Sequence, residues 1–161
     1  MKKIIFKPIG IIHTPFKEAM GTPIQPRAAQ NIEGVIEIYP DYQKALMDLD
    51  GFSHIILLYH FHLAKKWNWK VKPYMDHIEH GLFATRAPTR PNPIGLSVVN
   101  LIRIEHEKLF VKGTDIIDST PLLDIKPYVS DFDYVKNIKI GWLEHKIKKL
   151  AETKDDNRFI E

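Results

Sequence analysis

The sequence predicts a single domain that is mainly β, with short helices and a C-terminal helix. Three observations support this fold class: several short runs of β-branched residues, a strand-like alternation over Ser53–Leu63, and three closely spaced prolines, Pro88, Pro91 and Pro93, that exclude a helix. The chain of 161 residues is ample for one domain. We therefore expect one unit over 1–161, with a core at 4–133 and a C-terminal helix and tail at 134–161.

The N-terminal part is expected to hold two strands joined by a long loop. Ile4–His13 is apolar and β-branched and closes at a Thr-Pro turn, which is typical of a strand. Lys17–Gln30 has glycine and prolines without periodicity, and long loops of this kind often bind ligands. Gly34–Tyr39 alternates as a second strand and is stopped by Pro40.

The next segment predicts a short helix, Tyr42–Leu49, capped by Asp41, and a third strand, Ser53–Leu63. Alternation places Ile55, Leu57, Tyr59, Phe61 and Leu63 on one face of this strand, and His54, Ile56, Leu58, His60 and His62 on the other. Such a strand suits a barrel or a sheet with a functional side. His60 and His62 are a candidate metal pair, but no third ligand stands at fitting spacing, so a lining histidine is favoured.

Lys65–His80 is basic and aromatic and shows no clean period, which predicts a loop. Its lysines interleaved with tryptophans suit contact with phosphates and stacking on bases. The alternative is a solvated loop whose tryptophans are anchored in the core or in a dimer interface.

The rest of the chain predicts further strands and a helix. A short strand is expected at Phe83–Ala87, a hairpin at Gly95–Ile104 and Leu109–Thr114 with its turn at residues 106–108, and a structured loop at Asp115–Tyr128. From Trp142 onward the apolar residues Leu143, Ile147, Leu150 and Ala151 follow helical spacing, which predicts an amphipathic C-terminal helix and then a polar tail.

Two segments carry the residues best suited to chemistry. Phe83–Ser97 combines the three prolines with Arg86 and Arg90, whose planar guanidinium groups suit carboxylate or phosphate. Asp115–Tyr128 holds carboxylates that can accept from ribose hydroxyls or bind a metal. The alternatives are a rigid turn with surface arginines in the first case and ordinary turn chemistry in the second.

Composition narrows the function classes. The chain has no cysteine, which excludes disulfides, thiolate catalysis and cysteine-ligated metals. Its longest apolar run, Ile55–Tyr59, is too short to span a bilayer, so we expect a soluble, cytoplasmic protein. A net charge of +3 permits contact with phosphates. No G-x-G-x-x-G, Walker A or G-x-S-x-G motif is present, so the commonest nucleotide-binding architectures are not supported.

Four blocks resemble one known family, the TsaA-like or TrmO tRNA methyltransferases. They are Ile9–Phe16, Gly51–His54, Phe83–Ser97 and Asp115–Tyr128, and they stand in matching order. The resemblance implies a β-barrel that binds S-adenosylmethionine without a Rossmann fold. It also implies a homodimer with cofactor sites near the subunit interface. The reaction it implies is methyl transfer to N6 of a threonylcarbamoyl-modified adenosine beside the tRNA anticodon.

The resemblance also implies site residues. Cofactor contacts would fall on Pro23, Ile24, Gln25, His62, Leu63, Arg86, Leu96, Asp115, Ile116, Ile117 and Asp118. Arg86 would pair with the methionine carboxylate, and Asp115 or Asp118 would accept from ribose hydroxyls or from the amino group. Arg90, Asn92 and Asp118 are the catalytic candidates, with Arg90, Asn92 and the lysine-rich loop facing the tRNA anticodon loop. No metal is expected.

Other functions stay open from the sequence. The same cofactor site could methylate a different substrate, or the protein could be a sensor that binds S-adenosylmethionine without catalysis. A metal-dependent hydrolase on the histidine face is the remaining alternative. After Tyr128 we expect only a short helix and a charged tail, where longer relatives carry an additional domain that helps grip tRNA.

Overall fold

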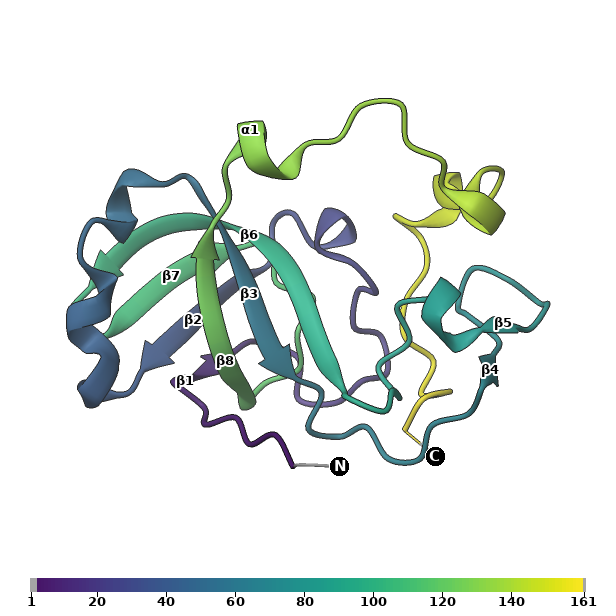
Figure 1. The fold of residues 1–161 in the computed structure, drawn as a ribbon, viewed down its shortest axis with the longest axis horizontal. Coiled ribbons are helices and arrows are strands. Elements are labelled where there is room, and N and C mark those ends of the chain that lie inside the picture. Colours follow the sequence, from purple (N-terminus) through teal and green to yellow (C-terminus); the bar gives the residue numbers. More distant parts are fainter. Residues whose placement is uncertain (1–2, 161) are drawn as a thin grey trace.

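The structure, a computed structural model, describes residues 3–160 and is built around an antiparallel β-barrel (Figure 1). Within the described residues, the strands close the barrel in the order β1-β2-β7-β6-β3-β8. Their bounds are β1 (Gly10–His13), β2 (Glu33–Ile38), β3 (His54–His60), β6 (Ile94–Glu105), β7 (Lys108–Lys112) and β8 (Thr120–Pro127). The predicted mainly-β fold is confirmed.

The barrel interior is filled by the inward-facing residues of each strand. On β3, Ile55, Leu57 and Tyr59 are buried, as the alternation predicted, and the residues between them are only partly covered. Residues of the other strands complete this core: Ile12, Ile36, Ile38, Val99, Leu101, Leu109, Val111 and Leu122. The interior is therefore packed with side chains, and a ligand has to bind at an end of the barrel.

The first strand is shorter than predicted. Residues 4–9 lie outside β1, and Ile4, Ile5 and Phe6 are largely exposed, because β2 and β8 offer partners to β1 only from Gly10 onward. A Cβ at position 10 would lie 2.4 Å from the carbonyl oxygen of Glu37, so glycine allows the two strands to approach closely.

The predicted helix at 42–49 is instead a pair of 3-10 helices, η2 (Pro40–Leu46) and η3 (Leu49–Gly51). Asp48 between them has φ +65°, a left-handed conformation that interrupts any continuous helix. Leu46 and Leu49 still pack against the barrel core.

The prediction of a loop over 115–128 is wrong from Thr120 onward. There β8 pairs with both β1 and β3 and closes the barrel. Pro121 and Pro127 obscured this strand in the sequence, but they stand near its two ends, where a missing N–H costs least.

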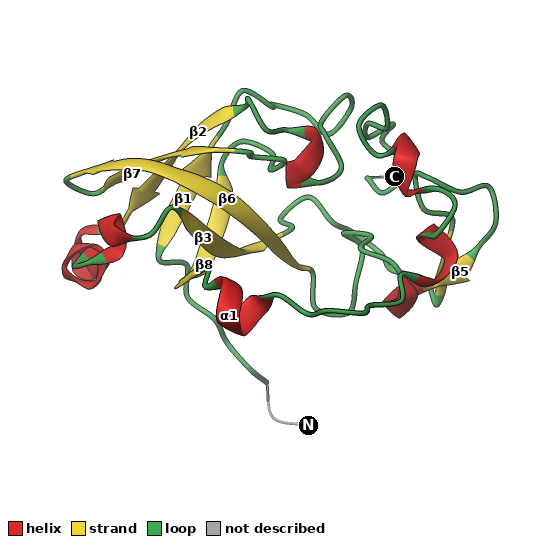
Figure 2. Cartoon of the chain, turned by 90° about the horizontal axis from the view of Figure 1, so that it is seen from above, coloured by secondary structure: helices red, strands yellow, loops and turns green. Residues whose placement is uncertain are grey.

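A second region, which carries no barrel strand, lies beside the barrel (Figure 2). It contains the two-stranded β4 (Lys70–Val71) and β5 (His80–Gly81), and the short helices η4 (Leu82–Ala84), η5 (Gly141–Leu143) and η6 (Ile147–Lys149). Two other short helices belong to the barrel side: η1 (Pro26–Ala28) in the loop between β1 and β2, and α1 (Ser130–Asp133) just after β8. The segment 65–80 was predicted to be a loop, and that prediction is wrong at β4, which lies inside it, and at its last residue, which begins β5. The strand predicted at 83–87 is replaced by η4, whose turn is closed by the bond from Thr85 N to the Leu82 carbonyl.

The predicted C-terminal helix is also absent, because tertiary contacts hold its turns separately. Trp142 Nε1 donates to the Ala84 carbonyl at 2.8 Å, and its ring stacks on His80. The buried Asp76 accepts from His80 Nε2 at 2.8 Å and also from Lys146. These contacts with the β4–β5 region outweigh the helical preference of the segment. No helix within residues 3–160 is long and apolar enough to cross a membrane.

Candidate functional site

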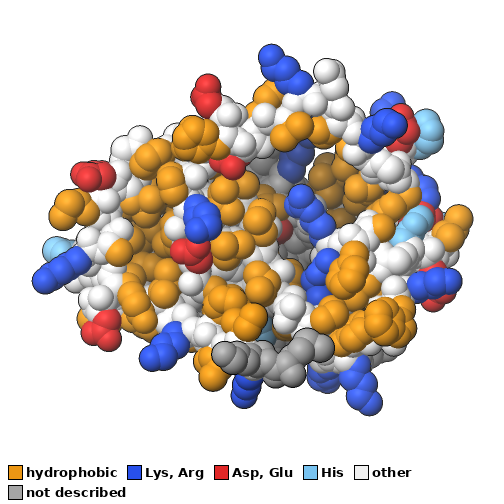
Figure 3. Space-filling view, viewed as in Figure 1, with side chains coloured by type: hydrophobic (Ala, Val, Ile, Leu, Met, Phe, Trp, Pro, Cys, Tyr) orange, Lys and Arg blue, Asp and Glu red, His pale blue; other side chains and the backbone are white. Residues whose placement is uncertain are grey.

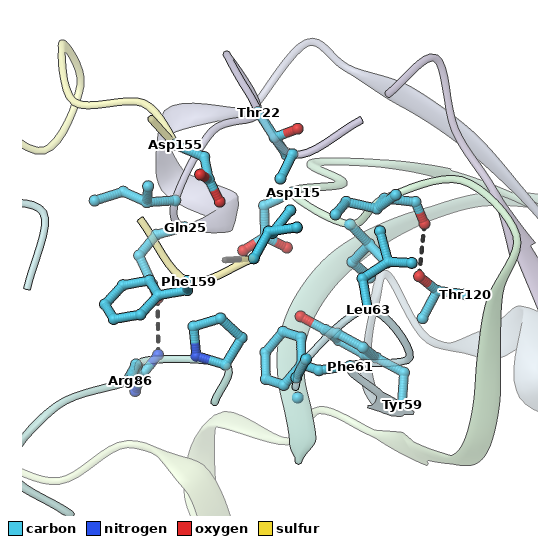
Figure 4. Close-up of a pocket in the computed structure, with 18 of the residues that line it drawn as sticks. Thr22, Gln25, Tyr59, Phe61, Leu63, Arg86, Asp115, Thr120, Asp155 and Phe159 are labelled. Atoms are coloured by element: carbon cyan, nitrogen blue, oxygen red, sulfur yellow. Dashed lines mark hydrogen bonds between the residues drawn. The ribbon is translucent and has the colours of Figure 1, made fainter. Parts of the chain in front are cut away.

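A pocket of about 350 Å³ opens where the ends of β3 and β6 meet three loops and the C-terminal tail (Figure 4). Its size falls at the lower end of the range for small-molecule sites. The loops contribute residues 19–25, 61–64 and 85–90, and the segment leading into β8 contributes residues 115–117. The pocket therefore collects segments far apart in the sequence.

The pocket contains nearly all of the predicted cofactor residues. Pro23, Ile24, Gln25, His62, Leu63, Arg86, Leu96, Asp115, Ile116 and Ile117 line it, and Asp118 does not. Of the catalytic candidates, Arg90 lines the pocket and Asn92 does not.

One end of the pocket carries a buried polar chain from Tyr59 through Ser97 to Asp115. Ser97 Oγ donates to Asp115 Oδ1 at 2.7 Å, so the Tyr59 hydroxyl, 3.0 Å from Ser97 Oγ, must donate to the serine. Burial raises the pKa of Asp115 to about 6 and also raises the pKa of Tyr59. This chain fixes the position of one carboxylate inside the pocket.

Arg86 is an exposed cation at the mouth of the same pocket. Its Nη1 donates to Gln25 Oε1 at 2.9 Å, a bond that ties together two segments predicted to contact one ligand (Figure 4). The other guanidinium nitrogens of Arg86 make no hydrogen bond within residues 3–160, so they can receive a carboxylate or a phosphate.

Arg90 is used differently, although it is only four residues away. Its Nη1 donates to the backbone carbonyls of Thr85 and Ala87, at 2.9 and 3.3 Å. The guanidinium therefore stabilises the proline-rich loop that contains Arg86. The rigid loop predicted from the sequence is held by this arginine as well as by its prolines.

The wall beside Leu63 and Leu96 is mainly apolar and aromatic. Tyr59 and Phe61 meet edge to face with ring centroids 5.3 Å apart. His62 Nδ1 lies 3.3 Å from Thr120 Oγ1, and burial together with neighbouring His60 lowers the pKa of His62. His62 thus lines the pocket. No group of three or more His, Asp or Glu side chains in residues 3–160 could hold a metal ion.

Asp118 lies outside the lining and braces the loop at Thr14–Lys17. Its Oδ1 accepts from Thr14 N at 3.0 Å and its Oδ2 pairs with Lys17 Nζ at 2.7 Å. Burial opposes ionisation, but these bonds together hold the pKa of Asp118 at about 2.

Several lining residues were absent from the sequence prediction: Thr22, Tyr59, Tyr74, Asp155, Phe159 and Ile160. Three of them belong to the C-terminal tail, which was predicted to be merely polar. The adjacent apolar pair Phe159 and Ile160 in that polar tail was the available signal.

The family model for the tRNA-methyltransferase O N-terminal domain matches residues 11–134. This chain belongs to that family. The match spans the whole barrel from Ile11 to β8 and the short helix that follows, so the resemblance stated from the sequence is confirmed.

Three relatives of this chain have informative names. A probable S-adenosyl-L-methionine-binding protein of Pyrococcus abyssi is 54% identical over 98% of this chain and 85% of its own length. A probable S-adenosyl-L-methionine-binding protein of Archaeoglobus fulgidus is 43% identical over 89% of this chain. A mouse tRNA (adenine(37)-N6)-methyltransferase is 35% identical over 92% of this chain, which spans only 36% of the mouse protein.

A solved structure of the family supports the same assignment. The crystal structure of TrmO from Pseudomonas aeruginosa superposes with a TM-score of 0.74 at 38% identity, over 88% of this chain and 63% of that one. The chain therefore spans under two thirds of that structure and of the mouse and Archaeoglobus proteins, and most of the Pyrococcus protein.

Proposed function

We propose that this protein is an S-adenosylmethionine-dependent methyltransferase that methylates N6 of threonylcarbamoyl-modified adenosine beside the tRNA anticodon. The observation that carries the proposal is the pocket itself. It brings together an arginine with free donor nitrogens, a fixed carboxylate and an apolar wall at one end of the barrel. A relative of the chain is named as a tRNA methyltransferase.

The chemistry of the lining fits S-adenosylmethionine. The free nitrogens of Arg86 suit the methionine carboxylate, and Asp115 suits ribose hydroxyls or the amino group. Leu63, Leu96 and Phe61 offer apolar surface for the adenine. Asp118 acts indirectly in this proposal, because its bonds with Thr14 and Lys17 hold the loop that precedes the lining residues.

A second, wider cavity of about 1070 Å³ adjoins the first and is the proposed entrance for the tRNA. The two share lining residues, among them Gln25, Arg86 and Leu96, and the wider one also has Arg27 and Lys112. Lysine and arginine side chains gather around a hollow between the barrel and the second region (Figure 3). A cationic rim suits the phosphates of an anticodon loop, whose unpaired bases can be splayed toward a pocket.

Catalysis would depend mainly on binding and alignment by the residues of this chain. S-adenosylmethionine supplies an already activated methyl group when bound. The residues of this chain would bind and orient it, exclude water and align the acceptor nitrogen. Arg90 and Asn92 remain proposed catalytic or tRNA-facing residues, with Arg90 acting at least by holding the loop of Arg86.

A methyl-transfer assay tests the proposal. Protein and labelled S-adenosylmethionine would be mixed with total tRNA prepared with and without the threonylcarbamoyl modification. We expect label only in the modified tRNA, and its loss in Arg86→Ala. Arg103→Ala is the matched control, since Arg103 stacks on Phe110 and pairs with Glu105 away from both cavities.

The same assay separates the alternatives. Absence of label in every tRNA, with cofactor binding intact, would overturn the tRNA assignment. A different substrate or a sensor role would then replace it, and that candidate is supported by a Pyrococcus relative named only for binding the cofactor. A tRNA-acting enzyme is expected in the cytoplasm, which imaging of a tagged chain would check.

A homodimer is also part of the proposal. Phe132, Tyr134, Val135 and Ile138 expose large apolar side chains on one short stretch, and such a surface suits burial by a second copy. Analytical ultracentrifugation should give twice the chain mass, and a monomer at micromolar concentration would contradict the prediction.

A further inference from the structure

The C-terminal tail is an integral wall of the pocket. Gly21 N donates to the Asp155 carbonyl at 2.8 Å and Asp155 N donates to the Thr22 carbonyl at 2.9 Å, next to a β-bridge between Pro23 and Lys154. These bonds attach the tail to the loop that carries Pro23, Ile24 and Gln25.

The other side of the tail is attached to the segment after β4. Arg158 Nη1 donates to the Pro73 carbonyl at 3.0 Å and its guanidinium lies over the Tyr74 ring. Phe159 is buried and meets the same ring edge to face at 5.0 Å, within a small cluster that includes Val71 and Leu82. The tail thus spans the pocket between two loops and holds a fixed position.

This fixed position directs two polar groups at the pocket. Asp155 lines it, and its Oδ1 accepts from Asn157 N at 2.7 Å, while its Oδ2 has no hydrogen bond or ion pair within residues 3–160. Tyr74 lines it too, and its buried hydroxyl has no hydrogen-bond partner among the same residues. Burial raises the pKa of Tyr74, and the neighbouring Asp155 carboxylate raises it further.

A buried hydroxyl without a partner is costly, and so is a carboxylate that faces a confined space with a free oxygen. Figure 4 shows Asp155 and Phe159 on the side of the pocket away from Thr120. Asp115, the other carboxylate of the lining, already has Ser97 on Oδ1. Asp155 therefore keeps one carboxylate oxygen without a hydrogen bond, and it makes no ion pair within residues 3–160.

We propose that Asp155, supported by the Tyr74 hydroxyl, is a ligand-binding residue that recognises a cationic group of the bound cofactor. The tail lies outside the segment 11–134 that the family model matches. The inference rests on the proposed cofactor. Two groups of S-adenosylmethionine carry positive charge, the ammonium and the sulfonium, and an unpaired carboxylate suits either.

Calorimetric titration with three compounds tests the proposal. S-adenosylmethionine has both charges, S-adenosylhomocysteine has only the ammonium, and methylthioadenosine has neither. We expect Asp155→Asn to weaken S-adenosylmethionine binding about tenfold and methylthioadenosine binding hardly at all. Loss with both charged ligands identifies the ammonium, and loss with S-adenosylmethionine alone identifies the sulfonium.

Controls keep the outcomes distinct. Glu152→Gln removes the same charge from an exposed tail position outside the pocket and should leave all three affinities unchanged. An unchanged thermal midpoint for Asp155→Asn shows that the tail still folds. Equal affinities of Asp155→Asn and wild type for every ligand would overturn the inference while leaving the proposed cofactor intact. Wild-type protein that binds none of the compounds would overturn both.

Discussion

The ring of Tyr59 lies directly over the backbone of Gly95, on the neighbouring strand. A Cβ at position 95 would stand 2.2 Å from Tyr59 Cε2, well inside van der Waals contact. The two residues are paired between β3 and β6, where both strands reach the pocket. The glycine in the motif Pro93-Ile94-Gly95 thus makes room for the aromatic ring that begins the polar chain to Asp115.

Replacing this glycine should damage both the barrel and the site. We expect Gly95→Ala to lower the free energy of unfolding by about 2–3 kcal/mol, because the ring must move within a packed core. Urea denaturation measures this. Gly81→Ala is the matched control, since a Cβ there meets nothing within 4 Å, and it should change stability by less than about 0.5 kcal/mol. Equal effects of the two substitutions would refute the steric argument.

Ser97 should prove costly to remove, because it serves two buried partners. Ser97→Ala leaves the Tyr59 hydroxyl and the Asp115 carboxylate each short of a bond, which should cost about 2 kcal/mol. Adding Tyr59→Phe should cost less in the Ser97→Ala background than in wild type, since the hydroxyl has already lost its acceptor. Strictly additive losses of unfolding free energy in a double-mutant cycle would contradict the hydrogen-bonded series Tyr59–Ser97–Asp115. Ser130→Ala, at an exposed serine, is the control and should be nearly neutral.

Asp115 should make stability fall as pH rises. Its native pKa of about 6 exceeds that of the unfolded chain, so the native state holds its proton more tightly. The associated stability is present below about pH 4 and is lost on passing to pH 6, by up to roughly 3 kcal/mol. The free energy of unfolding of ligand-free Asp115→Asn should therefore rise relative to that of wild type as the pH is raised from 4 to 7. A constant difference across that range would argue against the raised pKa.

Asp118 should show the opposite pH dependence. Its native pKa of about 2 lies below that of the unfolded chain, so its contribution is full above about pH 4 and disappears as pH falls toward 2. Asp118→Asn should cost about 2 kcal/mol at pH 7, with the difference shrinking in acid. Cofactor affinity should fall less than in Arg86→Ala, because Asp118 holds a loop and does not line the pocket. Asp124→Asn, at an exposed ion pair with Lys126, should be nearly neutral.

The predictability of this fold varied with the local pattern. The strand predicted at Ser53–Leu63 is correct over β3, where Ile55, Leu57 and Tyr59 face inward because one buried side imposes a period of two. It ends at His60, and Leu63, predicted on the same face, is exposed. β8 was missed, because Pro121, Asp124 and Pro127 imitate a loop while partners on both sides maintain the strand. The C-terminal helix was predicted and does not form, since helical spacing says nothing of the contacts that Trp142 and Lys146 make elsewhere.

The site was predictable only where motifs were present. The resemblance selected Arg86, His62 and the Pro23–Gln25 loop, which the structure brings into one pocket. Periodicity could not have predicted that these residues lie together, because their proximity depends on closure of the barrel. Tyr74 and Asp155 carried no motif, and their positions follow from long-range bonds between the tail and two loops.

The tail has a consequence for the order in which the protein matures during synthesis. The barrel strands end at Pro127, whereas Asp155 and Phe159 are made much later. A nascent chain could close its barrel on the ribosome and still hold an open, incomplete pocket, since domains fold as their segments emerge. On the proposed role of the tail, cofactor capture would be the last event of biogenesis, and a chain interrupted shortly before residue 154 would have all its barrel strands but an incomplete pocket.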